Sequence, residues 1–508
     1  MSDILYVLQN KSIRLDTAQM DTKPLAGVVV PGHYEQTFLP DGINADKIFN
    51  SDLLLTDLPD AIAPGSSELI ELILRDPRSQ YLAERRIASR TLIKSSKKAQ
   101  RWVRIGAFGN SFLISLITTN CLRLLTRIQP KSVLFDSTPH DIQSWIIGKA
   151  SEYLHIPVVL CKFSPMHWRF GYCIGIDSQI WLQEKISEDE SNADSRNKLE
   201  RLVELNLKDY ATATPSYMRA ASSQQFSSRM KNFNVNGAIF RIISKGVRRI
   251  DLLRRIRKTS YPERRSGIYH AALDKASSYS EMGSACTQNI DLGHGKRFIT
   301  LFLHYQWERT SLPEGGIFSQ QAQAIIWLRE WLPQDVMLYV KEHPMMLGKY
   351  TSNTLRPSGF YSFIASLNNV ELVSPDIDSF DLIDASEMIS TITGTVGFQA
   401  LCRKTPVLAF GPANYLAHPA AFRVNSDMPD FTTIITRFNS EAPEFKPEYL
   451  KRYLSDLLPY TVGGDTEDDD LYSTGATSEA HRKAVSEFSL HWQRESFRES
   501  IKAPTDLS

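Results

Sequence analysis

The sequence lacks the features that would place it in several large classes of protein. Its 508 residues include only five cysteines, which are scattered and never spaced as CxxC. This pattern argues against a disulfide framework and a structural zinc site, and it fits a reducing cytoplasm. No stretch approaches the roughly 18–20 consecutive apolar residues of a bilayer span. The N-terminus has no basic segment followed by an apolar core, so we predict no secretion signal.

An excess of charge of one sign is also missing. The chain has 58 Lys and Arg against 57 Asp and Glu, a net charge of +1. A dedicated nucleic-acid binder usually has a strong basic excess, so we expect no nucleic-acid partner. The sequence has no GxxxxGK[ST], HExxH or GxSxG motif and no GxGxxG after a first strand. We also predict no metal site, because the DxD match formed by Asp376 and Asp378 has a spacing that is common by chance.

The apolar pattern that is present predicts two α/β domains. Buried runs at residues 132–136 and 158–160 flank an amphipathic helix, which is typical of a βαβ unit. From residue 298 to residue 410, short apolar strands alternate with helices, which predicts a doubly wound parallel sheet. A long amphipathic helix is expected at 478–499. We predict an N-terminal Rossmann-like domain with helical insertions over 1–285, a second Rossmann-like domain over 286–475, and a C-terminal helix within 476–508.

Polar residues directly follow several of the predicted strands. In a parallel sheet, ligands collect in the crevice at the carboxyl ends of the strands. Four groups of residues are expected at such ends: His140 and Asp141; His304, Gln306 and Glu308; Lys341 and His343; and Thr393, Gly394, Thr395 and Gly397.

The Thr393-Gly-Thr-Val-Gly397 turn opens a predicted helix. The N-terminus of a helix offers backbone N–H groups and a positive dipole end, which suit a phosphate. Two glycines let an anion approach the backbone, and the hydroxyls of Thr393 and Thr395 add donors. An ordinary helix cap made by either threonine is the alternative interpretation.

Two histidines are candidates for the chemistry. His343 is followed by Pro344, which fixes the turn and aims the imidazole away from the sheet; a structural role is the alternative. His140 stands beside Asp141, and a neutral imidazole with a carboxylate nearby suits a general base at neutral pH. Asp141 is equally well placed to cap the helix that begins at residue 142.

Together these motifs resemble one family. The order strand-HYQ-x-E, strand-KEHP, strand-TGT-x-GF-x-A and PVLAFG is similar to that of bacterial capsule and surface-polysaccharide biosynthesis proteins of the GT-B type. The resemblance covers residues 298–414 and, more weakly, 125–163. The His343-Pro344 pair is similar to one in bacterial sialyltransferases and capsule Kdo transferases, where it contacts the phosphate of the donor nucleotide.

The resemblance implies a GT-B-like fold with two facing domains, the nucleotide-sugar on the second, the acceptor on the first, and a C-terminal helix that packs back toward the first. It also implies a metal-independent glycosyltransferase without a cofactor, which moves a sugar from a CMP- or UDP-linked donor to a growing surface polysaccharide or a lipid-linked glycan. The implied donor contacts are His304, Gln306, Lys341, His343, Thr393, Gly394, Thr395, Gly397 and Gln399. The implied catalytic residues are His140 or Asp141, as the base, and Glu308.

Three other interpretations stay open at this point. An enzyme similar to UDP-GlcNAc 2-epimerases would share the architecture and the His-Pro turn but need no acceptor. A non-catalytic, glycan-binding subunit is favoured by Gln399, because many relatives have Glu at this position, which is associated with the ribose of the donor. Finally, residues 245–265 contain nine Lys or Arg. They form either a solvated helix or a surface that binds the inner face of the cell membrane, since each surface-bound cation contributes about 1 kcal/mol.

Overall fold

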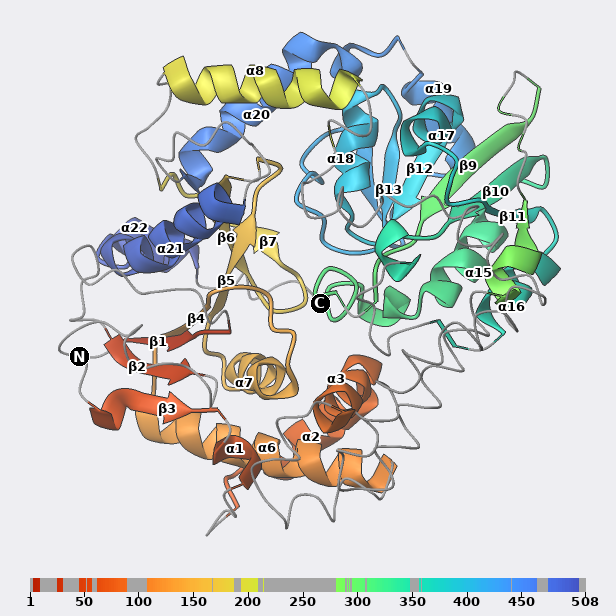
Figure 1. Ribbon diagram of the computed structural model, residues 1–508. Coiled ribbons are helices and arrows are strands. Elements are labelled where there is room, and N and C mark those ends of the chain that lie inside the picture. The colour runs from red at the N-terminus through yellow and green to blue at the C-terminus, as the bar shows by residue number, and fades with distance from the viewer. Residues whose placement is uncertain are drawn as a thin grey trace, which may run out of the picture. The chain divides into compact units, whose positions relative to one another are not determined.

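A computed structural model of the chain shows two compact units, each built around its own β-sheet (Figure 1). Unit 1 comprises Met1–Leu202, Leu312–Ser319 and Leu450–Ser508, and unit 2 comprises Val203–Ser311 and Gln320–Tyr449. The structure describes residues 3–9, 25–30, 45–51, 53–56, 62–88, 107–166, 168–186, 193–208, 213, 280–287, 290, 292, 295–306, 308–347, 356–357, 359–439, 441–463 and 474–501.

The sheet of unit 1 has the strand order β15-β6-β5-β4-β1-β2-β3, with β7 paired to β6. Neighbouring strands from β5 to β3 are parallel, whereas β6, β7 and β15 pair in antiparallel fashion. The strands are β1 (Ile4–Val7), β2 (Leu25–Val30), β3 (Ile48–Asn50), β4 (Ser132–Phe135), β5 (Val158–Phe163), β6 (Arg169–Ile174), β7 (Ile180–Trp181) and β15 (Val462–Gly463). β1, β2, β4 and β6 are buried along their whole length, which explains the continuous apolar runs of β1 and β2.

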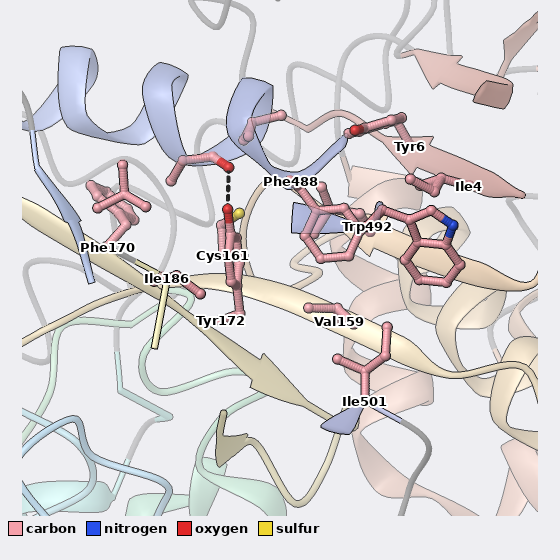
Figure 2. Packing of buried hydrophobic residues seen from close by; sticks show 14 of the residues in the cluster. Ile4, Tyr6, Val159, Cys161, Phe170, Tyr172, Ile186, Phe488, Trp492 and Ile501 are labelled. Carbon is pink, nitrogen blue, oxygen red and sulfur yellow. Dashed lines mark hydrogen bonds between the residues drawn. The ribbon is translucent and has the colours of Figure 1, made fainter. Parts of the chain in front are cut away.

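Two C-terminal helices, α21 (Thr474–His491) and α22 (Glu495–Ser500), complete the core of unit 1. Figure 2 shows Phe488 and Trp492 packed among side chains of the sheet. The Tyr172 hydroxyl on β6 donates a hydrogen bond of 2.7 Å to the carbonyl oxygen of Ala484 on α21. The core of unit 1 is therefore built from the first and the last parts of the chain.

The other helices of unit 1 include one long apolar helix, α6 (Ala107–Ile128). Within the part of the chain that the structure describes, its segment Asn110–Ile128 has the length and hydropathy to cross a membrane, but 56% of its most apolar window is buried. It packs against α1 (Leu53–Thr56), α2 (Ser66–Arg75), α3 (Pro77–Ala88) and α7 (Ile142–Tyr153). These contacts are those of a core helix in a globular unit.

Unit 2 contains a fully parallel sheet with the order β14-β13-β12-β9-β10-β11-β8. The strands are β8 (Cys286–Thr287), β9 (Arg297–Phe302), β10 (Val336–Lys341), β11 (Val370–Val373), β12 (Met388–Thr391), β13 (Val407–Ala409) and β14 (Ala421–Arg423). The connecting helices are α15 (Gln321–Trp331), α16 (Phe360–Ser366), α17 (Ser379–Ala385), α18 (Thr395–Cys402) and α19 (Phe431–Arg437). The predicted doubly wound α/β class is thereby confirmed.

The division of the chain differs from the one predicted at residues 285 and 475. The first boundary between unit 1 and unit 2 falls inside α8 (Ala193–Lys208), and the last boundary falls near the start of α20 (Pro447–Leu457). Helices lie at these two of the four boundaries, so the local sequence carries no linker signal there, and the other two boundaries flank Leu312–Ser319. The final helix, expected at 478–499, ends at His491, and α22 follows it. The basic stretch 245–265 lies outside the described residues.

Candidate functional site

Three adjacent strands of unit 2 bring the predicted site residues to one edge of the sheet. β9 lies between β12 and β10, and Phe302 on β9 is level with Thr391 on β12 and Lys341 on β10. The chain winds outward from β9 through β10 to β11 on one side and continues through β12 and β13 on the other. This is the point where the strand order reverses, which is where ligands bind in open α/β sheets.

A cavity of about 130 Å³ lies at this edge. Whole ligand sites commonly measure about 300–1,000 Å³, so this cavity has room for a fragment such as a phosphate group. Of the residues predicted from the sequence, its lining includes His304, Glu308, Lys341, His343, Thr393, Gly394, Thr395 and Gln399. Gln306, which is half-buried, and Gly397 are not part of the lining.

The N-terminus of α18 forms one wall of the cavity. Its N-cap is Gly394, so no side chain caps the helix. The Thr393 hydroxyl instead donates to the carbonyl oxygen of Thr310 at 2.8 Å. Because neither threonine caps the helix, its positive end faces the cavity through the backbone of the first turn, as anion binding requires.

The two glycines of this turn are required by packing. A Cβ atom on Gly397 would lie 2.1 Å from the hydroxyl oxygen of Tyr415, and that hydroxyl donates to the Gly394 carbonyl oxygen at 3.0 Å. A Cβ atom on Gly394 would lie 3.1 Å from Nε2 of His304. Gly397 therefore makes room for Tyr415, and Gly394 lets His304 approach the turn.

His304 holds the turn in place. Its Nε2 accepts a hydrogen bond of 3.1 Å from the backbone N–H of Thr393 and lies 3.0 Å from Oγ1 of Thr391. An accepting Nε2 carries no proton, so the ring is the neutral Nδ1–H tautomer. Burial, together with the nearby His343 and Arg356, lowers the pKa of His304 to about 3. The imidazole is thus a neutral support for the N-terminus of α18.

His343 and Lys341 differ in charge and in what they contact. Burial lowers the pKa of His343 to about 4, so its half-buried imidazole is neutral at pH 7. Lys341 is 2% exposed, and burial lowers its pKa to about 8, which leaves it mostly protonated at pH 7. The Lys341 ammonium donates to the carbonyl oxygens of Pro375, at 3.4 Å, and Ile377. Lys341 therefore supplies positive charge at the cavity while holding the loop that follows β11.

Gln399, from the TGT-x-GF-x-A motif, and Glu308, from the HYQ-x-E motif, also line the cavity. The buried Gln399 side chain donates to the carbonyl oxygen of Ala213 at 3.5 Å. Glu308 is half-buried, and its backbone N–H donates to the Tyr305 carbonyl oxygen at 3.3 Å. The Ala213 contact could not be predicted from the sequence, because residue 213 lies far from every motif.

His140 and Asp141 belong to unit 1, at the carboxyl end of β4. Oδ1 of Asp141 accepts from the backbone N–H of Ser144 at 2.9 Å, so Asp141 is the N-cap of α7. The backbone N–H of His140 donates to Oε1 of Gln9 at 3.0 Å, and Nε2 of Gln9 donates to the Ser137 carbonyl oxygen at 2.8 Å. Sequence reasoning missed Gln9; the pairing of β1 with β4 explains its place, because both loops leave the same edge.

Glu314 is a second residue that sequence reasoning missed. It lies in Leu312–Ser319, the segment of unit 1 that comes between β9 and α15 in the sequence. Its buried carboxylate accepts from the Thr138 hydroxyl at 2.6 Å and lies 3.6 Å from Nζ of Lys162. The loop that contains His140 is therefore held from two sides, by Gln9 and by Glu314.

Over the described residues, no group of three or more His, Cys, Asp or Glu side chains gathers as a metal site would need.

Two Rossmann-like α/β units, with a pocket at the switch point of the second, fit the predicted GT-B-like fold. Residues 317–418 match the family described as capsule polysaccharide biosynthesis protein. The resemblance predicted from the sequence motifs is confirmed over this segment, which contains the KEHP and TGT-x-GF elements. A comparison with curated protein sequences finds no match.

A comparison with solved structures finds matches that include a Kdo transferase and a UDP-GlcNAc 2-epimerase. The KpsC beta Kdo 2,7 transferase of Thermosulfurimonas dismutans has 11% identity and a TM-score of 0.31, over 71% of this chain and 88% of that chain. MnaA of S. aureus with UDP has 13% identity and a TM-score of 0.20, over 100% of both chains. The UDP-GlcNAc 2-epimerase of Neisseria meningitidis has 12% identity and a TM-score of 0.20, over 95% of this chain and 99% of that chain. At these TM-scores, none of the three decides between sugar transfer and epimerisation.

Proposed function

We propose that the protein is a glycosyltransferase of surface-polysaccharide synthesis, which uses a CMP- or UDP-linked sugar as donor. One observation carries this proposal: the cavity of unit 2 combines an uncapped helix N-terminus, a buried lysine and a histidine at the switch point of a parallel sheet. Each of these three groups favours a phosphate. The match of residues 317–418 to the capsule family supports the same conclusion.

In the proposed reaction, the bond between the anomeric carbon and the donor phosphate breaks, and the acceptor hydroxyl oxygen bonds to that carbon. The leaving phosphate gains negative charge, which the α18 N-terminus and Lys341 stabilise. His343 donates a hydrogen bond to the phosphate as a neutral imidazole. As negative charge develops on the phosphate, the pKa of His343 rises and the imidazole takes up a proton more readily, because a nearby anion favours the charged form of histidine.

The acceptor hydroxyl must lose a proton during transfer. We assign this role to His140, because Asp141 is occupied as the cap of α7. The half-buried His140 is held through its backbone by Gln9, which fixes the loop without using the imidazole. A growing surface polysaccharide or a lipid-linked glycan is the proposed acceptor, at the inner face of the cell membrane or in the cytoplasm.

Nucleotide binding is the first test. We expect CMP, UDP or one of their sugar conjugates to raise the midpoint of thermal unfolding, because a ligand that binds the folded state stabilises it by mass action. His343→Ala should abolish this shift. The matched control is His155→Asn, since His155 is exposed, lies in unit 1 and has a left-handed backbone that asparagine tolerates.

Product analysis separates transfer from the alternatives. A nucleotide-sugar that is consumed only when a glycan acceptor is present supports transfer. Interconversion of the sugar without an acceptor would instead identify an epimerase, and binding without turnover over a panel of acceptors would identify a non-catalytic subunit. The proposal fails if no nucleotide shifts the unfolding midpoint, or if His343→Ala and the wild type shift equally.

A further inference from the structure

A buried ion pair joins Glu342, which belongs to the KEHP motif and lines the cavity, to Arg356, which lies outside the sequence motifs. Arg356 and Glu342 have side chains that are 2% and 0% exposed. Nε and Nη2 of Arg356 donate to the two carboxylate oxygens of Glu342 at 2.8 and 2.9 Å. This is the bidentate arrangement for which the planar guanidinium is suited and the lysine ammonium is not.

The carboxylate of Glu342 is fully occupied. Besides Arg356, it accepts from the Tyr361 hydroxyl at 2.8 Å and from the backbone N–H of His343 at 2.7 Å. A buried carboxylate with four donors has no capacity left to act as a base or to bind a ligand. Glu342 therefore contributes to the site by fixing its neighbours.

The same guanidinium also holds the other side of the cavity. Nη2 of Arg356 donates to the carbonyl oxygen of His304 at 2.9 Å and to Oε1 of Gln321 at 3.2 Å. Gln321 in turn accepts from the backbone N–H of His304 at 2.8 Å. The ion pair is thus tied to the main chain of His304, after β9, and to the main chain of His343, after β10.

We propose that Arg356, paired with Glu342, is a positioning residue that sets the backbone of His304 and His343 at the required separation for phosphate binding. Both histidines line the cavity, and the ion pair contacts both of them through backbone atoms. A buried pair tolerates loss of one partner poorly, because an uncompensated charge is left behind. This inference rests on the proposed function for its ligand, but its structural part is testable in the ligand-free protein.

The test compares Arg356→Lys with Arg297→Lys. Arg297 is a matched control, because it also makes a bidentate pair, with Glu387, and lies at the opposite end of β9. With histidines labelled by ¹³C, the titration of His343 is followed by NMR without ligand. We expect Arg356→Lys to loosen the loop, expose the ring to water and move the pKa of His343 from about 4 toward its ordinary value. The control should leave this titration unchanged.

Binding of CMP and UDP gives the second readout. We expect Arg356→Lys to weaken it about tenfold in the folded protein, as the loss of an outer hydrogen-bond partner commonly does at metal sites. A variant that keeps the wild-type His343 titration and nucleotide affinity, with only lower stability, would overturn the proposal. If the wild type binds no nucleotide, the proposed function fails, while the titration still decides the positioning role.

A milder change covers the case in which Arg356→Lys does not fold. Tyr361→Phe removes one hydrogen bond from Glu342 and leaves the ion pair in place. We expect a smaller shift of the His343 titration in the same direction. An unchanged titration in folded Tyr361→Phe, together with unfolded Arg356→Lys, would show that the pair supports the fold alone and would refute the proposal.

Discussion

At the scale of single residues, burial decides what the two cavity histidines can do. His304 is neutral because burial lowers its pKa and no acidic side chain offsets this effect. Its Nε2 accepts the hydrogen bond from the backbone N–H of Thr393. His343 is also neutral, and the adjacent carboxylate of Glu342, which favours its charged form, is shared with Arg356. The ligand-free cavity thus keeps one imidazole as a support and one as a group whose proton affinity a bound anion can change.

This difference predicts that nucleotide-sugar binding depends on pH. A bound phosphate raises the pKa of His343 above its ligand-free value of about 4, so binding takes up a proton. Affinity should fall above about pH 8, where Lys341 loses its proton. Below pH 7 it should rise as the pH falls below the pKa of His343 in the complex, and level off below about 4. One proton limits the rise to about tenfold per pH unit. Calorimetric titration with a nucleotide-sugar between pH 5 and pH 8 measures it.

The control for this prediction is His343→Ala measured over the same range. Any residual binding in that variant should not vary with pH below about pH 7, where Lys341 keeps its proton. Affinity that falls as the pH is lowered, or a pH dependence that persists in His343→Ala, would contradict proton uptake by His343.

At the scale of elements, substitutions at the start of α7 distinguish a capping role of Asp141 from a catalytic one. Asp141 caps α7 through Ser144, and asparagine caps helices about as well as aspartate. Asp141→Asn should therefore keep both the stability of unit 1 and the transferase activity. Asp141→Ala should lower the free energy of unfolding by about 1 kcal/mol. Urea unfolding and initial rates of transfer measure the two effects.

The outcome that opposes this assignment is a folded Asp141→Asn protein with wild-type stability and no activity. Such a variant would return the base role to the carboxylate of Asp141. His140→Gln serves as the comparison, because it removes the proposed base and leaves the cap in place.

The strands that could be predicted from sequence are those with continuous apolar runs. β4, β5, β9 and β10 lie inside the two sheets and are almost wholly buried, so their sequences carry a strong signal. β6 was missed because it begins with a charged residue, Arg169, and contains Gly171, so its apolar signal is weaker. In the structure this arginine is 5% exposed and donates to Thr461, which follows α20 by only a few residues. A partner so far away along the chain cannot be recognised from the local sequence around Arg169.

The residues of the candidate site divide in the same way, into those that the local sequence predicts and those that long-range contacts place. His304, His343 and the turn at Thr393 could be predicted because each directly follows a buried strand. Arg356 and Gln9 could not, because their roles come from contacts with residues far away in the sequence. The packing role of Gly397 was also hidden, since Tyr415 lies beyond the next strand.

At the scale of the whole molecule, unit 1 is assembled from distant parts of the chain. Seven residues of α21, α22 and their ends join its main apolar cluster: Ala480, Ala484, Val485, Phe488, Trp492, Phe497 and Ile501. Each large side chain contributes about 1.5–3 kcal/mol when buried, and a folded unit has a net stability of only about 5–15 kcal/mol. Unit 1 should not tolerate the loss of these helices.

Truncation tests this dependence. A chain that ends before Thr474 should lose the folded structure of unit 1, which limited proteolysis would detect as rapid cleavage within residues 1–202. A chain that ends after Ile501 is the matched control and should resist protease as the full chain does, because it keeps α21 and α22. Equal resistance of the two truncated chains would contradict the role of the C-terminal helices.

The split composition of unit 1 has a consequence for biosynthesis. On the ribosome, β1, β4 and β6 emerge long before the helices that cover them, and at about 5–20 residues per second the delay is on the order of tens of seconds. During that interval the nascent sheet exposes the apolar face that α21 later covers. Newly made protein therefore depends on chaperones for protection until translation is complete, and its yield on expression is expected to rise when elongation is faster or chaperone levels are higher.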